Sequence, residues 1–483
     1  MILSKSLQEN ITTAKSILPI SNSFDIITRT ITLGNISGYF IGINGLCKLD
    51  LLQDIFSNLQ NPLYYYNLNP CSMKELVEQK IGYAQVTLTS NWDILIKNVL
   101  SGPGILFLDG FEQALILDTR SYPTRGISEP ETEKIIREAK DGFVETVLFN
   151  TNMIRRRIRS PKLTFEITSI GKESKTDIVI AFMNGLAEED LLLQIRKKLS
   201  GIDADSLTMG MKSLEELLLH KRWYHPLPAF FSTERPDVAC SYLMEGYVLL
   251  MVDTTPAALI LPCSLFQFTQ SPEDYYKSTV VGTYIRIIRF ICLFLSLFLF
   301  SVFLLLASNP GLLPESINLM PSGSIEPFRL FFYVLIAELI LDLFKYSSSH
   351  APGGFSGSLA IVGGLLIGNV AIELQWASTE VIFYAAATLL ASLSLPNIDL
   401  SESIRVYRLF LTILTGLFHL SGFLIGLVLI GLSIFTTPVF AGKSYFWPLI
   451  PFNFSALKTL LIRYPTFMAQ PNHIWHHTSK KKN

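Results

Sequence analysis

The chain has 483 residues, of which 49% are hydrophobic, and its formal net charge is −1. The charges are unevenly distributed, because residues 1–280 hold 27 basic and 32 acidic side chains, whereas residues 281–483 hold 12 and 8. A chain of this length exceeds one compact core, and the acidic balance of its first part argues against nucleic acid as a partner.

Cysteine usage and the first residues indicate a cytosolic location for the polar part of the chain. The five cysteines are widely spaced and include no CxxC pair, so neither a disulfide framework nor a zinc site is predicted. Charged residues also interrupt residues 1–30, which leaves no signal-peptide core. We therefore expect an N-terminal module in the cytoplasm.

An internal repeat divides this module into two related subdomains, at about 20–120 and 160–265. The segment Asn44–Ile55 matches Asn184–Ile195 in its Asn-Gly pair, in one aspartate and in its apolar spacing. With a shift of 144 residues, Gly102, Asp109 and Ala114–Leu117 match Gly246, Asp253 and Ala258–Leu261.

Each copy has the pattern of a strand, a turn and a helix. Apolar runs at Gly38–Ile43 and Asp177–Met183 lead into the Asn-Gly turns, after which apolar residues follow at helical spacing. Ile105–Leu108 and Leu249–Val252 then predict buried strands that return through tight turns. The fold predicted for the module is two duplicated α/β subdomains, and the repeat itself names no ligand.

Two joining helices are predicted in residues 121–160, between the copies. Carboxylates lie early in this segment, and Arg155, Arg156, Arg157 and Arg159 gather at its other end. One interpretation of the arginines is an anionic partner, either lipid headgroups or an acidic surface of a neighbouring subunit. The alternative is a helix end with salt-bridged arginines.

Residues 281–483 predict a polytopic α-helical membrane domain. From Phe290 to Ala307 no residue is charged, which is enough helix to cross most of a hydrocarbon layer of roughly 30 Å. Clustered glycines in this part permit close approach of helices and favour an assembled bundle. The candidate spans are Ile285–Ala307, Phe328–Phe344, Gly357–Ile372, Val381–Ser394 and Leu409–Phe435.

The basic residues around these spans predict an orientation and also a conflict. Arg286 and Arg289 precede the first span and Lys345 follows the second, so the positive-inside tendency places the N-terminal module in the cytoplasm. If all five candidates crossed, however, Lys458 and Arg463 would lie on the opposite side. This conflict indicates that one candidate is not a complete crossing.

Two carboxylates within the second span form a candidate ion pathway. Glu338 and Asp342 are four residues apart, so they project from one helix face. A charge in hydrocarbon is unfavourable by roughly 2.5–3.5 kcal/mol on insertion scales unless it faces protein or water. Facing the axis of an oligomer, the pair would form a ring that attracts cations. The alternative is an internal pair with Lys345, Arg405 or Arg408.

The predicted organisation is a soluble module followed by a membrane domain. No Ser/His/Asp, Cys/His or paired-carboxylate arrangement in residues 1–280 has the context that an enzyme needs, so we expect no catalytic site, no cofactor and no metal. The predicted parts are a first α/β subdomain (1–120), a connecting helical segment (121–160), a second α/β subdomain (161–280) and a transmembrane helical domain with a C-terminal tail (281–483).

Several motifs resemble the A subunits of bacterial spore germination receptors, the GerA family. They are the stretches Ile136–Glu145 and Asn150–Ile158, the TERPD motif at Thr233–Asp237, and Leu243–Gly246 with Val252–Pro256. The residues that match the family motifs are Arg137, Asp141, Gly142, Glu145, Asn150, Arg155, Arg156, Arg157, Glu234, Arg235, Pro236, Asp237, Glu245, Gly246, Asp253 and Pro256.

Departures from the receptor pattern point to one branch of that family. Glu138-Ala139-Lys140 stands where receptor A subunits usually have Gly-Pro-Arg, and Asp253-Thr254-Thr255-Pro256 replaces a DGTP turn. With the segment Pro123–Glu133, these features look most like the stage V sporulation protein AF branch.

The resemblance implies a protein of the inner spore membrane that assembles as a homo-oligomer and conducts small cations during germination. Its implied partners are other germination membrane proteins, either a permease-like B subunit or a small membrane protein. The alternative is a non-conducting scaffold or receptor subunit that docks a permease-like partner.

Overall fold

The computed structural model describes residues 2–34, 36–61, 73–83, 85–120, 140–219, 225–309, 326–350, 372–373, 378–440 and 444–464. The chain divides into two compact units. The sheet unit consists of Met1–His220, Phe230–Cys263 and Gln470–Asn483, and the helical unit of Lys221–Ala229 and Ser264–Ala469.

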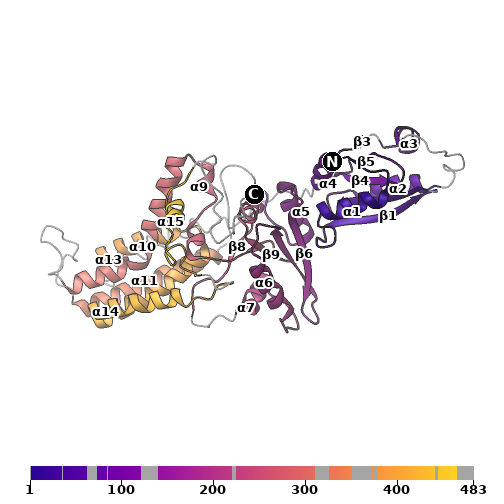
Figure 1. The fold of residues 1–483 in the computed structure, drawn as a ribbon. Coiled ribbons are helices and arrows are strands. Elements are labelled where there is room, and N and C mark those ends of the chain that lie inside the picture. The colour runs from indigo at the N-terminus through magenta and orange to yellow at the C-terminus, as the bar shows by residue number, and fades with distance from the viewer. Residues whose placement is uncertain are drawn as a thin grey trace. The chain divides into compact units, whose positions relative to one another are not determined.

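The first subdomain of the sheet unit is built on a five-stranded sheet in the order β1-β2-β4-β5-β3, with every pairing antiparallel. Its strands are β1 (Ile26–Leu33), β2 (Ile36–Ile43), β3 (Val86–Thr89), β4 (Gly104–Leu108) and β5 (Ala114–Leu117). Its helices are α1 (Leu7–Ile17), α2 (Leu49–Gln60), α3 (Met73–Lys80) and α4 (Trp92–Ser101) (Figure 1).

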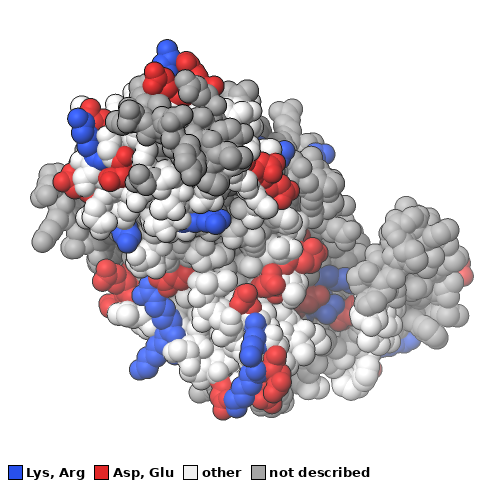
Figure 2. Space-filling model, turned by 90° about the vertical axis from the view of Figure 1, so that its right-hand side faces the viewer, with Lys and Arg blue, Asp and Glu red and all other residues white. Residues whose placement is uncertain are grey.

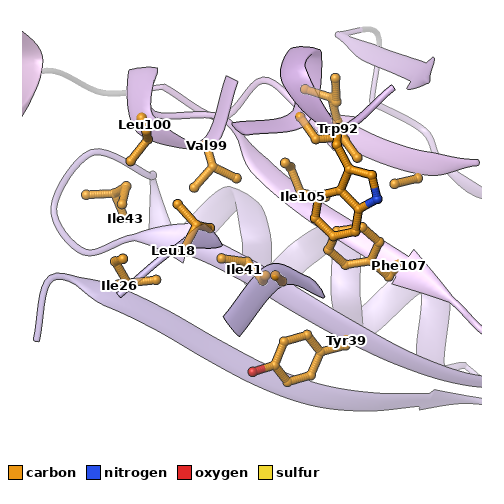
Figure 3. Close-up of a cluster of buried hydrophobic side chains, with 14 of the residues drawn as sticks. Leu18, Ile26, Tyr39, Ile41, Ile43, Trp92, Val99, Leu100, Ile105 and Phe107 are labelled. Atoms are coloured by element: carbon orange, nitrogen blue, oxygen red, sulfur yellow. The ribbon is translucent and has the colours of Figure 1, made fainter. Parts of the chain in front are cut away.

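Helices cover both faces of this sheet. Side chains of α1 and α4 form one core with alternate residues of β2 and β4, and side chains of α2 and α3 form another with the residues between them. In the first core the rings of Trp92 and Phe107 stack with their centroids 5.5 Å apart (Figure 3). Burial on both faces explains why β4 and β5 are apolar at every position, without the alternation of a half-exposed strand.

The second subdomain repeats this architecture. Its five antiparallel strands follow the order β6-β7-β9-β10-β8, which is the order of the first sheet. The strands are β6 (Leu163–Ile170), β7 (Thr176–Met183), β8 (Phe231–Thr233), β9 (Val248–Val252) and β10 (Ala258–Leu261). The helices are α5 (Val147–Arg157), α6 (Glu189–Ser200), α7 (Met211–Leu218) and α8 (Pro236–Met244).

Helix α5 has the place in the second subdomain that α1 has in the first. The backbone N–H of Leu7 donates to Asp109 Oδ1 at 3.0 Å, and that of Val147 donates to Asp253 Oδ1 at 3.0 Å. The sequence predicts that α5 belongs to the segment that joins the copies. The structure instead gives it a repeated hydrogen bond inside the second copy.

The helical unit contains the long apolar helices. They are α10 (Thr279–Ser308), α11 (Pro327–His350), α13 (Thr379–Leu393) and α14 (Ile398–Phe435), with the short elements η2 (Leu265–Thr269), α9 (Glu273–Tyr276) and α15 (Phe454–Leu461). Among the described residues, α10 is long and apolar enough to cross a membrane, and α13 is a shorter apolar helix. Helix α14 meets the same criterion only when it is counted through the break at His419. Apart from Ile372, the predicted span at 357–372 lies outside the described residues.

Helix α14 is not one straight rod. His419 has φ 51° and ψ −129°, which interrupts the helix. Tyr407 Oη lies 2.6 Å from Ser433 Oγ, although 26 residues of straight helix would separate them by about 39 Å. A Cβ added to Gly426 would lie 2.5 Å from Leu411 Cδ1, so the helical segments before and after His419 are in close contact. The predicted single span at 409–435 is therefore wrong: the chain folds back at His419.

The fold-back brings the basic residues to one end of the helical unit. The backbone N–H of Arg463 donates to Thr283 Oγ1 at 3.1 Å, and Arg286 Nη1 donates to the carbonyl of Thr459 at 3.0 Å. The C-terminal helix α15 thus lies beside the first turns of α10. The conflict in the charge distribution arises because no feature of the sequence marks the reversal at His419.

Candidate functional site

The family-motif residues of the described chain gather in the second subdomain, where they support one another. The N–H of Phe143 donates to the carbonyl of Glu234 at 2.8 Å, and Arg157 Nη2 donates to Asp141 Oδ1 at 2.7 Å. Gly142 is buried between these contacts. Arg137 lies outside the described residues. Two motifs that are about 90 residues apart in the sequence are thereby joined in one framework.

The turn between β9 and β10 is tied to the start of α5. The N–H of Thr254 donates to the carbonyl of Glu145 at 2.7 Å, while Asp253 caps the helix through the bond to Val147. Asn150 is fully buried and both accepts from and donates to the backbone of Val144. The hydrogen bonds of these polar groups hold the turn and the helix together, which is a structural role.

The TERPD motif starts α8. Arg235 is fully buried and donates through Nε and Nη2 to the two carboxylate oxygens of Asp237, at 3.1 and 2.8 Å. Pro236 occupies the first helical position, where its missing N–H has no helical partner to lose. After the helix, Gly246 adopts a φ of +92°, which glycine tolerates without strain.

Glu245 has a carboxyl group whose pKa is raised. It follows the last residue of α8, and burial of its carboxyl raises the pKa from 4.5 to about 7. The remaining motif residues, Arg156 and Pro256, have exposed side chains.

A buried ion pair links the two subdomains, and the sequence motifs include only one of its two residues, Arg155. Arg155 Nη2 lies 2.9 Å from Asp25 Oδ2, and both side chains are 0% exposed. Ser23 Oγ donates to the same carboxylate and accepts the N–H of Phe165 at 2.9 Å. Arg155 also donates to the carbonyls of Ser160 and Leu163. The lone carboxylate between Phe24 and Ile26 is the signal that could have pointed to this partner.

These contacts favour one of the two interpretations of the arginine cluster. Arg155 and Arg157 are both paired with carboxylates of the same chain. Arg155 is inaccessible to any external anion. The salt-bridged helix end therefore describes these two side chains.

In the helical unit, Glu338 and Asp342 each lie beside an arginine of α14. Arg408 Nε and Nη2 donate to the Glu338 carboxylate at 2.8 Å, and Arg408 Nη1 donates to the carbonyl of Ser296 on α10 at 3.3 Å. The side chains of Glu338 and Arg408 are 1% and 4% exposed. This pair therefore ties three apolar helices together.

The ion pair between Asp342 and Arg405 is longer and more exposed than that between Glu338 and Arg408. Arg405 Nε lies 3.5 Å from Asp342 Oδ1, and the two side chains are 29% and 33% exposed. Lys345 Nζ lies 3.4 Å from Ser401 Oγ. Of the two candidate carboxylates, only Asp342 is accessible within the isolated chain. The predicted alternative of internal pairing thus describes the arrangement of Glu338.

Charges of both signs alternate over the described surface on the face shown in Figure 2. Neither sign forms a continuous field there. A surface of this kind offers no electrostatic track for a phosphate backbone.

Comparison with known proteins finds a family model and relatives that match this chain. The sequence model of the Bacillus/Clostridium GerA spore germination protein matches residues 15–473. Stage V sporulation protein AF of Bacillus subtilis (strain 168) is 33% identical over 449 residues, covering 93% of this chain and 90% of that protein. Spore germination protein KA of the same organism is 28% identical over 470 residues, covering 96% and 86%.

One solved structure is also similar. It is the N-terminal domain of the A subunit of the Bacillus megaterium spore germinant receptor GerK3, with a TM-score of 0.41 and 27% sequence identity. The match covers 54% of this chain and 96% of that domain.

Proposed function

This chain belongs to the Bacillus/Clostridium GerA spore germination protein family, and we propose that it is a membrane subunit of the germination machinery whose helical unit, as a homo-oligomer, conducts small cations. The sheet unit would act as the cytoplasmic part that responds to partners and biases the conformation of the helical unit. No catalytic step is part of this proposal.

The location in a membrane is supported by the helical unit itself. Helix α10 has a mean hydropathy of 2.9 over its most apolar window, and many of its large side chains are exposed, including Ile291 at 53% and Phe294 at 57%. Exposed apolar surface of this extent calls for lipid or a neighbouring subunit. The inner spore membrane is the location we propose, with the basic end of the helical unit on the cytoplasmic side.

The observation that carries the proposed conductance is the Asp342–Arg405 pair. A carboxylate among apolar helices is a functional residue by default, because an uncompensated charge there is unfavourable. Glu338 is neutralised by Arg408, but Asp342 is one-third exposed and held at 3.5 Å. In an oligomer, Asp342 carboxylates released from Arg405 would attract cations to a shared axis.

Planar bilayer recordings of the purified full chain would test this proposal. Asp342→Asn is expected to lower cation conductance several-fold, whereas Glu326→Gln, an exposed carboxylate before α11, serves as the matched control and leaves it unchanged. Unaltered conductance in Asp342→Asn would remove this carboxylate from the pathway. A strictly monomeric mass in lipid nanodiscs would exclude a shared axis altogether.

The second candidate is a non-conducting scaffold that docks a permease-like partner. The observation in its favour is the closed Glu338–Arg408 pair, which rigidifies α10, α11 and α14 and offers no charge to an ion. Absence of current from wild-type protein that is shown to be oligomeric would favour this candidate.

A further inference from the structure

A cluster of arginines lies where α9, the first turns of α10 and the residues after α15 meet within the helical unit. Arg289 donates through Nη1 and Nη2 to the two oxygens of Asp274, at 2.8 and 2.9 Å. Arg286 Nε reaches the same carboxylate at 3.3 Å. One buried carboxylate therefore serves two buried guanidinium groups.

Arg463 adds a third guanidinium group, whose partners in the described part of the chain are neutral. Its Nη1 donates to Thr279 Oγ1 at 3.1 Å and its Nη2 to the carbonyl of Tyr275 at 2.8 Å. The Arg286 guanidinium carbon lies 5.1 Å from the centre of the Tyr275 ring. The side chains of Arg286 and Arg463 thus both lie against Tyr275.

Each of these two arginines has a buried N–H group that has no hydrogen-bond partner among the described residues. They are Nη2 of Arg286, whose residue is 3% exposed, and Nε of Arg463. A buried donor on a charged group that lacks an acceptor destabilises a fold. Unused donors beside excess positive charge are the features of a site for an anion.

The local charge balance also favours a site for an anion. The described segments 264–309 and 444–464 hold five basic side chains and two acidic ones. One of the acids, Glu273, lies 3.5 Å from Lys277. Asp274 alone is left for three arginines, so the cluster has a net positive charge that no side chain of these segments neutralises.

We propose that Arg286 and Arg463 form a binding site for a phosphate group. The planar guanidinium presents parallel N–H groups that match phosphate oxygens, and such charge-assisted bonds are stronger than neutral ones. Inorganic phosphate and the phosphodiester of an anionic phospholipid share this chemistry.

The inference that the phosphate group belongs to a lipid rests on the proposed membrane location. The inference that the two arginines bind a phosphate group does not. The cluster lies at the start of the apolar helix α10, at the level that a headgroup would have if α10 spans a bilayer. Phe452 and Phe454, which precede and begin α15, are 67% and 68% exposed. Exposed aromatic rings beside basic residues are typical of a membrane interface.

Lipid retention by the full chain tests the site. Protein reconstituted in nanodiscs of mixed phosphatidylglycerol and phosphatidylcholine is released and analysed by native mass spectrometry. We expect wild type to retain phosphatidylglycerol preferentially, and Arg463→Gln to weaken that retention about tenfold, the effect of about one charge-assisted contact. Arg329→Gln, an exposed arginine on α11 with the same loss of charge, should retain wild-type preference.

A second arm distinguishes the source of the phosphate. In detergent without lipid, inorganic phosphate is added and the melting temperature is compared with that in chloride at equal ionic strength. A rise in wild type that Arg463→Gln lacks, with no lipid preference, assigns the site to soluble phosphate. Arg463 is partly exposed, so its variant is expected to fold even if Arg286→Gln does not. If wild type showed no lipid preference and no stabilisation by phosphate, the proposal would be overturned. Equal losses in Arg463→Gln and Arg329→Gln would also overturn it.

Discussion

The helices α1 and α5 begin in the same way in the two subdomains, yet their later residues have opposite surroundings. Thr12 and Lys15 of α1 are exposed, whereas the residues at the matching positions of α5, Asn152 and Arg155, are fully buried. Asn152 packs against Gly45, where an added Cβ would lie 2.2 Å from its Nδ2. The repeated residues therefore build each subdomain, and the unrepeated ones join the two.

The Asn-Gly turns show the same difference. Gly45 and Gly185 both have positive φ, which explains why glycine stands at each. Gly45 is covered by α5, whereas no atom of the described residues lies within 4 Å of the Cβ position at Gly185. A feature that looks identical in sequence thus serves as a contact surface in one copy and as a plain turn in the other.

The largest effect is expected from the ion pair that links the subdomains. Arg155→Met should lower the free energy of unfolding by about 3–5 kcal/mol, because it leaves Asp25 buried without its countercharge. Lys15→Met, at the matching exposed position, should change it by less than about 0.5 kcal/mol. Thermal unfolding of the full chain measures both. Similar losses of stability in the two variants would show that the ion pair does not distinguish α5 from α1.

Glu245 and Ser101, the residue at the matching position of the first subdomain, should differ in their effect on the pH dependence of stability. The folded pKa of Glu245, about 7, lies above its ordinary value of 4.5, so the folded protein holds the proton more tightly than the unfolded chain. Its favourable contribution is present below about pH 4.5 and is lost as the pH rises through about 7. Glu245→Ser should remove this part of the slope in melting temperatures measured from pH 4 to 8; an unchanged slope would contradict the assignment.

The smallest effect concerns the turns before β5 and β10. Thr254 has φ 74°, a conformation that a β-branched residue adopts with strain, whereas Gly110 has φ 86° in the first copy. Thr254→Gly should raise the free energy of unfolding by about 1 kcal/mol, and Gly110→Thr should lower it by a similar amount. Denaturation midpoints report both changes. A loss of stability in Thr254→Gly would mean that the threonine side chain contributes more than its backbone strain removes.

Elements that depend on local physics can be predicted from the sequence alone. The apolar spacing of Asn44–Ile55 and Asn184–Ile195 marks amphipathic helices, and the uncharged run in α10 marks a helix suited to lipid. Asp109 and Asp253 stood out through the repeat, and both cap a helix. Family membership also followed from motifs that can be read residue by residue.

The tertiary structure alone decided which side chains meet. Asp25 and Arg155 are 130 residues apart and Glu338 and Arg408 are 70 apart, and no local pattern pairs them. The reversal at His419 is equally invisible, because the apolar sequence continues on both sides of one residue with positive φ. Periodicity reports how a segment folds against an apolar surface, whereas long-range pairing depends on where the whole chain places that surface.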